Sequence, residues 1–279
     1  ASGASEPVWT TALSAVAGIK YHYMGFCSSN ADVATASSSS TPSKVNTHIA
    51  TYNEGFSAKL QQSVFAHTGS ISAVKAGVAQ QNVGFCEIVY WRNAESLPCE
   101  WMGREIGARM REEAIDPDVN RTNPIANMPY RSVGELYGTA APVADAFTAA
   151  ELEDLLHSGV AAGAYDANGK PWIFIPRTTY FKDAFANTDH RVVYVSQTTT
   201  LYDIADDLAA WLPTRFPGAK VVPDLPQTGE ELPPKVVEES TVRSAIIGRS
   251  NGYVDLGWIR KDKLDEAVKD GSLRVKVAA

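Results

Sequence analysis

Runs of β-branched and aromatic residues alternate with helical patterns of apolar residues along the first half of the chain. The runs predict strands over residues 19–26, 61–67 and 83–91. The helical patterns predict helices that start near Pro42, that span Ser70–Gln80 and that span Pro98–Ala114. Strand and helix therefore alternate three times, which predicts an α/β fold: a mixed, largely parallel sheet with crossover helices. Because residues 83–91 are almost continuously apolar, this strand is expected to be buried on both faces.

The second half of the chain predicts a hairpin and further helices. Thr148 and Glu151 have capping-box spacing at the start of one helix. Asn168-Gly169 lies between two apolar runs and predicts a two-residue hairpin turn. Shorter helices are predicted over residues 236–247 and 262–269.

The strongest helical pattern spans Gln197–Leu212. Thr200 is expected to cap this helix and Pro213 to end it. Its apolar residues recur at intervals of three and four, as on one face of a helix, and are expected to lie in a core. They include Leu201, Ile204, Leu208 and Trp211.

A proline-rich stretch separates the two halves. Residues 116–142 contain four prolines and few apolar residues, which predicts a long irregular connection. We therefore expect a region of βα repeats with its connection over residues 1–142. A second, α+β region is expected over residues 143–279, ending in an extended arm.

Composition excludes several classes of protein. The 279 residues are 44% hydrophobic and carry a formal net charge of -7, without a long basic block, so a nucleic-acid-binding surface is not expected. No apolar run is long enough to cross a bilayer, and membrane binding is not expected. Three widely spaced cysteines argue against a disulfide framework and favour a reducing compartment. Cys86, inside an apolar run, is expected to pack as a small hydrophobe.

Motifs for catalysis or metal binding were not found. None of the five histidines has metal-ligand spacing to another histidine or cysteine, and phosphate-binding and nucleophile motifs are absent, so neither a metal nor a cofactor is expected. The charges of Arg104-Glu105 and of residues 109–113 predict a solvated helix face with i,i+4 pairs. We therefore expect a non-enzymatic protein.

An α/β enzyme remains the alternative. Its pocket would lie at the carboxyl ends of the parallel strands. The candidate residues for that pocket are Cys27, Asn93 and Asp166.

The last apolar segment alternates apolar residues with cations. It consists of Leu273, Arg274, Val275, Lys276 and Val277. Two interpretations stay open: an edge strand of its own domain that is protected by cations, and a strand donated to the sheet of a neighbouring subunit.

From residue 148 onward the chain resembles the tail sheath proteins of Mu-like contractile bacteriophages. The similarity lies in the order of short motifs, which are the Asp166–Gly169 turn, the strand Ile173–Ile175, Thr178-Thr179-Tyr180, the polar loop Asp183–Asp189, Arg215-Phe216-Pro217, Lys220 with Asp224, and Pro234-Lys235-Val236. The βα units before residue 148 have the same order of elements as that family, without distinctive motifs.

This resemblance implies a viral structural protein: a sheath subunit that polymerises around the inner tail tube and contracts during DNA ejection. Its partners would be identical subunits, the tube protein, the baseplate and the tail terminator. It would be assembled in the bacterial cytoplasm and end in the virion tail, without direct nucleic-acid contact. Because the family is longer and residues 1–10 offer no arm strand, the chain is expected to be a monomeric fragment that lacks an N-terminal arm.

The resemblance also suggests where subunits meet. Residues 273–277 would form the inter-subunit strand. The helix that follows residue 260 would contact the tube or a neighbour through Lys261, Lys263, Asp265 and Lys269, unless it is simply a solvated amphipathic helix. Another tail protein, from the tube or the baseplate, is a further alternative. The βα units argue against the tube, because tube proteins are mainly β-barrels.

Overall fold

The computed structural model describes residues 9–17, 19, 21–35, 38–53, 60–92, 97–115, 147–165, 171–173, 175–189, 193–224 and 232–273. The chain divides into two compact units, Ala1–Thr198 and Thr199–Ala279. The boundary predicted at residues 142–143 lies outside the described residues. The sheet of the first unit includes strands on both sides of that position.

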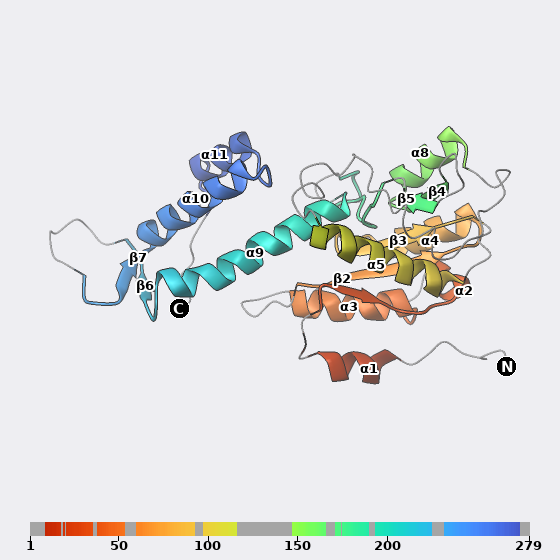
Figure 1. The fold of residues 1–279 in the computed structure, drawn as a ribbon, viewed down its shortest axis with the longest axis horizontal. Helices are drawn as coiled ribbons and strands as arrows, with labels where there is room; N and C mark the ends of the chain where they lie inside the picture. Colours follow the sequence, from red (N-terminus) through yellow and green to blue (C-terminus); the bar gives the residue numbers. More distant parts are fainter. Residues whose placement is uncertain are drawn as a thin grey trace. The chain divides into compact units, whose positions relative to one another are not determined.

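A five-stranded sheet forms the centre of the first unit (Figure 1). Its strands are β1 (Tyr23–Gly25), β2 (Gln62–His67), β3 (Cys86–Tyr90), β4 (Ala161–Tyr165) and β5 (Pro171–Ile173). They lie in the order β1-β2-β3-β4-β5, and β1 to β4 are parallel. Strand β5 returns antiparallel beside β4, as the predicted hairpin requires. The predicted largely parallel α/β fold is confirmed.

Helices precede, connect and flank these strands. They are α1 (Trp9–Val16), α2 (Asn30–Ala34), α3 (Thr41–Asn53), α4 (Ile71–Gln81), α5 (Pro98–Ile115) and α8 (Ala149–His157). Two predicted starts are confirmed by their hydrogen bonds. The Ser70 side chain accepts from the Ala73 N–H, and Thr148 forms the full capping box with Glu151.

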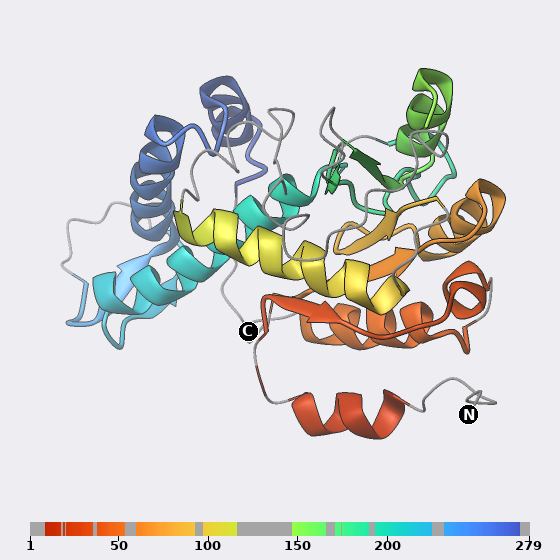
Figure 2. The same cartoon turned by 45° about the vertical axis from the view of Figure 1, so that its right-hand side comes forward.

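The sheet buries apolar side chains on both faces because successive strand residues point to opposite sides. Along β3, Ile88 and Tyr90 join the core beneath α1 to α4 and α8, whereas Val89 joins the core beneath α5. All five β3 residues are buried, including Cys86, as predicted. Figure 2 shows α5 on one face of the sheet and α3 on the other.

The prediction that the charges of α5 form a solvated face was wrong for two of them. Glu105 and Arg109 are both about 2% exposed, and they form the expected i,i+4 pair inside the protein. They are buried because β3 places a third charged side chain, Glu87, beneath the same helix.

The described residues of the second unit form three helices and two short strands. These are α9 (Val195–Arg215), whose first turn belongs to the first unit, β6 (Lys220–Val222), β7 (Val236–Glu238), α10 (Glu239–Asp255) and α11 (Lys261–Lys269). Strands β6 and β7 pair in parallel. The helix predicted over residues 236–247 instead begins as β7 and continues as α10 past Gly248.

Helix α9 is longer than predicted at both ends. It starts at Val195, where the Gln197 side chain accepts from the Tyr194 N–H, so Thr200 lies inside the helix rather than at its cap. Pro213 lies in the last turn, which continues because Phe216 N–H still donates to the Leu212 carbonyl at 2.9 Å. Proline removes only its own backbone donor at such a position.

The four apolar residues of α9 that were expected to lie in a core are not fully buried, contrary to the expectation. Leu201 is 54% exposed, and Ile204, Leu208 and Trp211 are half-buried. Among the described residues of the second unit, the buried apolar side chains are Val242, Tyr253 and Leu264. This unit therefore has a small core relative to its length.

Candidate functional site

The carboxyl ends of the parallel strands are where open α/β sheets bind ligands. In this protein the ends of β2 and β3 come together there. The Tyr90 hydroxyl donates to the Gly69 carbonyl at 2.8 Å. Asn30, at the start of α2, donates to Thr68 Oγ1 at 3.0 Å and accepts from the Thr68 N–H at 2.8 Å. These bonds fix the loop that follows β2.

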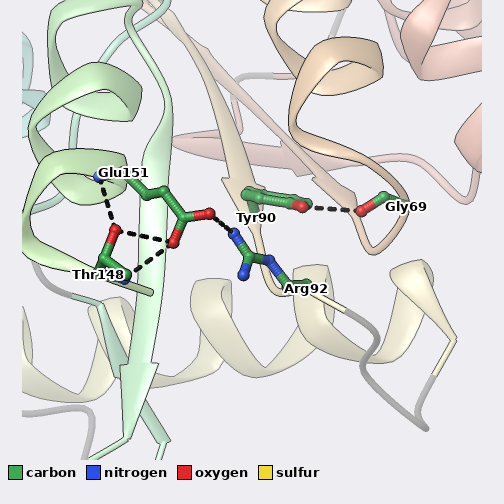
Figure 3. Close-up of polar contacts among 5 residues, drawn as sticks. All are labelled: Gly69, Tyr90, Arg92, Thr148 and Glu151. Carbon is green, nitrogen blue, oxygen red and sulfur yellow. Dashed lines mark hydrogen bonds and ion pairs between the residues drawn. The ribbon is translucent and has the colours of Figure 1, made fainter. Parts of the chain in front are cut away.

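A second group of polar contacts joins β3 to α8 (Figure 3). Glu151 accepts from the Thr148 N–H at 2.9 Å and from its hydroxyl at 3.1 Å, and it also forms an ion pair with Arg92. Arg92 lies 4.8 Å above the ring of Phe147. The Thr148 backbone donor, with Arg92 next, lowers the pKa of Glu151. Glu151 is therefore the ionised link between the start of α8 and the end of β3.

These side chains bond to one another, which is the arrangement expected of a structural clamp. His67 and Arg92 were not predicted as site residues, and Glu151 was predicted only as part of the capping box. Their positions in the sequence could have indicated this site. His67 is the last residue of one predicted strand and Arg92 follows another, at the edge of the sheet where parallel strands end. Of the enzyme candidates, Cys27 is exposed and lies near Cys99, whereas Asn93 and Asp166 lie outside the described residues.

His67 is a buried, neutral histidine at this edge. Its Nδ1 accepts from the Gly69 N–H at 3.1 Å, and its side chain contacts the backbone of Asn30. Burial lowers the pKa of His67 from 6.5 to about 4. Its protonation is therefore opposed by the fold.

This lowered pKa predicts acid-dependent loss of stability. In the unfolded chain His67 becomes protonated as the pH falls below 6.5. In the folded chain it becomes protonated only near pH 4, so the unfolded chain binds more protons between these values. The free energy of unfolding should therefore decrease as the pH falls from 6.5 to 4. This decrease should be steeper in the wild type than in His67→Gln, by about 1 kcal/mol per pH unit. Urea unfolding at several pH values measures both slopes, and parallel slopes would contradict the assignment.

In the described part of the chain, no three His, Cys, Asp or Glu side chains gather in a metal-binding group. None of the helices that the structure describes is long and apolar enough to cross a bilayer.

The predicted contact residues of the second unit are on α11. Lys261, Lys263, Asp265 and Lys269 are all exposed, whereas Leu264 is buried. Lys261 Nζ lies 2.6 Å from Asp265 Oδ1, and Lys263 Nζ lies 2.6 Å from Glu266 Oε2. Helix α11 thus presents a surface of mixed charge, which suits either interpretation made from the sequence.

Of the predicted inter-subunit strand, only Leu273 is described, and residues 274–277 lie outside the described part. The Leu273 N–H donates to the Ala267 carbonyl at 3.1 Å, closing the end of α11. Leu273 lines a pocket of about 450 Å³ together with Asp224, Ser240 and Arg243. Because Asp224 follows β6 and Ser240 follows β7, the pocket lies at the carboxyl ends of the two short strands.

A scan against known protein families and a search of curated proteins found no match to this chain.

Proposed function

We propose that this chain is a structural subunit of a contractile phage or prophage tail sheath, which polymerises around an inner tail tube and contracts during DNA ejection. The observation that carries the proposal is the two-stranded sheet of the second unit. Strands β6 and β7 contain three residues each and pair only over Lys220–Val222 and Val236–Glu238.

A sheet of this size is marginal by itself. Two-stranded sheets need further strands or extensive packing for independent stability. Within the described residues β6 pairs with β7 alone. On β7 the Val236 N–H already donates to the Pro233 carbonyl at 3.1 Å, so the outer edge of β6 is the proposed acceptor of another strand. A strand from a neighbouring subunit would add main-chain hydrogen bonds there and enlarge the sheet.

The apolar surface of the second unit is consistent with completion by assembly. Its described residues bury few apolar side chains, whereas Leu201 and Leu256 are 54% and 47% exposed. Units with so small a core are commonly stabilised by oligomerisation. Added subunits would cover such surfaces and supply the missing burial.

Residues 273–277 are the proposed donor. Their alternation of apolar residues and cations suits a strand with one face packed and one face solvated. They follow α11 in the sequence, and their first residue, Leu273, lines the pocket at the ends of β6 and β7. Donation of this strand from each subunit to the next is a head-to-tail contact, which generates an open helical polymer.

The proposed partners are those that the resemblance to sheath proteins implies. Identical subunits would exchange strands, and the inner tube, baseplate and tail terminator would meet the polymer's inner surface and ends. The exposed charges of α11 are the proposed contact with the tube or a neighbour. Contraction would be a rigid-body rearrangement about preserved strand links, without a catalytic residue or a cofactor.

Strand donation predicts a loss of assembly without a loss of folding. In the full-length gene product, Val275→Pro removes one backbone donor from the proposed strand, and deletion of residues 273–279 removes the strand. Both changes should abolish tubular polymers in negative-stain electron micrographs, whereas the circular dichroism spectrum of the subunit should be unchanged.

Val275→Thr is the matched control, because it keeps the backbone donor and the β-branched shape. It should assemble as the wild type does. Failure of the wild-type gene product to form tubes, alone or with its tube protein, would contradict the sheath proposal. Tubes formed by the Val275→Pro and deletion variants would contradict strand donation alone.

A further inference from the structure

Two cysteines that are far apart in the sequence meet beside the sheet of the first unit. Cys27 follows β1 by two residues and is exposed, and Cys99 is the second residue of α5 and is partly exposed. The two side chains lie close enough for Cys99 to contribute to the raised pKa of Cys27. Neither takes part in the contacts proposed between subunits.

The packing of β1 against α5 shows independently why these thiols meet. Gly25 is so close to α5 that an added Cβ would lie 2.8 Å from Met102 Sδ and 2.6 Å from Ile106 Cδ1. Cys27 is two residues beyond Gly25, and Cys99 is one helical turn before Met102. The same close approach therefore continues from Gly25 and Met102 to the two thiols.

We propose that Cys27 and Cys99 form an intramolecular disulfide when the protein meets a small organic disulfide such as oxidised glutathione. The Cys27 thiolate attacks one sulfur of glutathione disulfide, forms a mixed disulfide and releases one glutathione thiolate. The Cys99 thiolate then attacks the Cys27 sulfur and releases the second glutathione. The two protein thiols are oxidised, one glutathione disulfide is reduced to two thiols, and two protons are lost from the protein.

The third cysteine behaves differently. Cys86 is buried in β3, and burial raises the pKa of its thiol to about 11, so its thiolate is scarce and inaccessible. Burial, with Cys99 next, also raises the pKa of Cys27. The exchange should therefore accelerate as the pH rises above 7. The odd number of cysteines thus divides into one reactive pair and one inert core residue.

The test is a thiol–disulfide equilibrium in the whole chain. The protein is incubated at pH 8.5 with defined ratios of reduced to oxidised glutathione, quenched with N-ethylmaleimide and digested for mass spectrometry. We expect a peptide that links Cys27 to Cys99 and retention of one maleimide, on Cys86. Because the fold holds the thiols together, the equilibrium constant for this disulfide should be between about 30-fold and about 1000-fold larger in the native protein than in 8 M urea.

Matched variants decide the outcome. Cys86→Ser should leave the crosslink unchanged, whereas Cys27→Ser and Cys99→Ser should stop at a glutathione mixed disulfide on the remaining thiol. Equal equilibrium constants in native buffer and in urea would overturn the proposal, as would crosslinks only between chains. Neither result would bear on assembly into tubes, so this inference stands or fails separately from the proposed function.

Discussion

Replacing Arg109 by methionine is expected to lower the free energy of unfolding by about 3–5 kcal/mol at pH 7. Arg109 of α5 pairs with Glu87 of β3 and, at 2.6 Å, with Glu105 of α5. All three side chains are about 2% exposed. Methionine fills similar volume but leaves two carboxyl groups buried without their cation, which costs far more than the loss of an exposed pair.

The stability that Arg109→Met loses should decrease as the pH falls. Burial already raises the pKa of Glu87 in the wild type, against the lowering effect of Arg109. Without Arg109 the folded-state pKa of Glu87 rises further above the unfolded value of about 4.3. The folded variant then binds protons more tightly than the unfolded chain. Its stability deficit should be largest above the raised pKa of Glu87 and should shrink as the pH falls toward 4.3.

Urea denaturation at pH 8, 7 and 6 measures this deficit. Arg260→Met is the matched control, because Arg260 is 77% exposed in its pair with Asp262 and its loss should be undetectable. Adding Glu87→Leu and Glu105→Leu to Arg109→Met should recover most of the stability, since apolar residues of similar volume can replace a buried ionic group. A deficit below about 1 kcal/mol for the single variant would show that the triad is not desolvated.

This triad also shows where sequence reasoning stops. Residues 101, 105 and 109 fall on one stripe of a helix, and only the first, Trp101, is apolar. The stripe therefore gives no sign of burial at Glu105 and Arg109. Their burial depends on Glu87, which the sheet brings from a different element, and that pairing is tertiary information. Local patterns sufficed for the Thr148 capping box and for the largely parallel sheet, because the first depends on neighbouring residues and the second on the alternation of strands and helices.

The same reasoning explains the outcome in the second unit. The periodicity of Leu201, Ile204 and Leu208 identifies an amphipathic helix, and a helix is present. Periodicity cannot say what covers the apolar face, and Leu201 is exposed in the single chain. For a protein whose surfaces are completed by other subunits, positions that look like core in the sequence can be interface. The strand proposed for residues 273–277 remains a prediction for the same reason.

A second large effect is expected at Gly163 in β4. An added Cβ would lie 2.0 Å from Trp91 Cε2 and 2.2 Å from Trp91 Nε1. Trp91 is 4% exposed, and its ring stacks on that of Trp101 at a centroid distance of 4.0 Å. The other face of this packing is closed by Arg104, whose guanidinium lies 4.4 Å from the Trp101 ring. The indole could make room for a methyl group only by shifting within this buried stack.

Gly163→Ala should therefore destabilise the protein by about 3 kcal/mol, although it adds a single methyl group. Gly107→Ala in α5 is the matched control, because Gly107 is exposed and an added Cβ would meet no atom within 4 Å. This substitution should raise the free energy of unfolding by about 0.5–1 kcal/mol through the higher helix propensity of alanine. Urea midpoints report both changes. In a Trp91→Leu background the cost of Gly163→Ala should fall sharply, because the two changes share one contact. An equal cost in both backgrounds would show that the indole is not the obstacle.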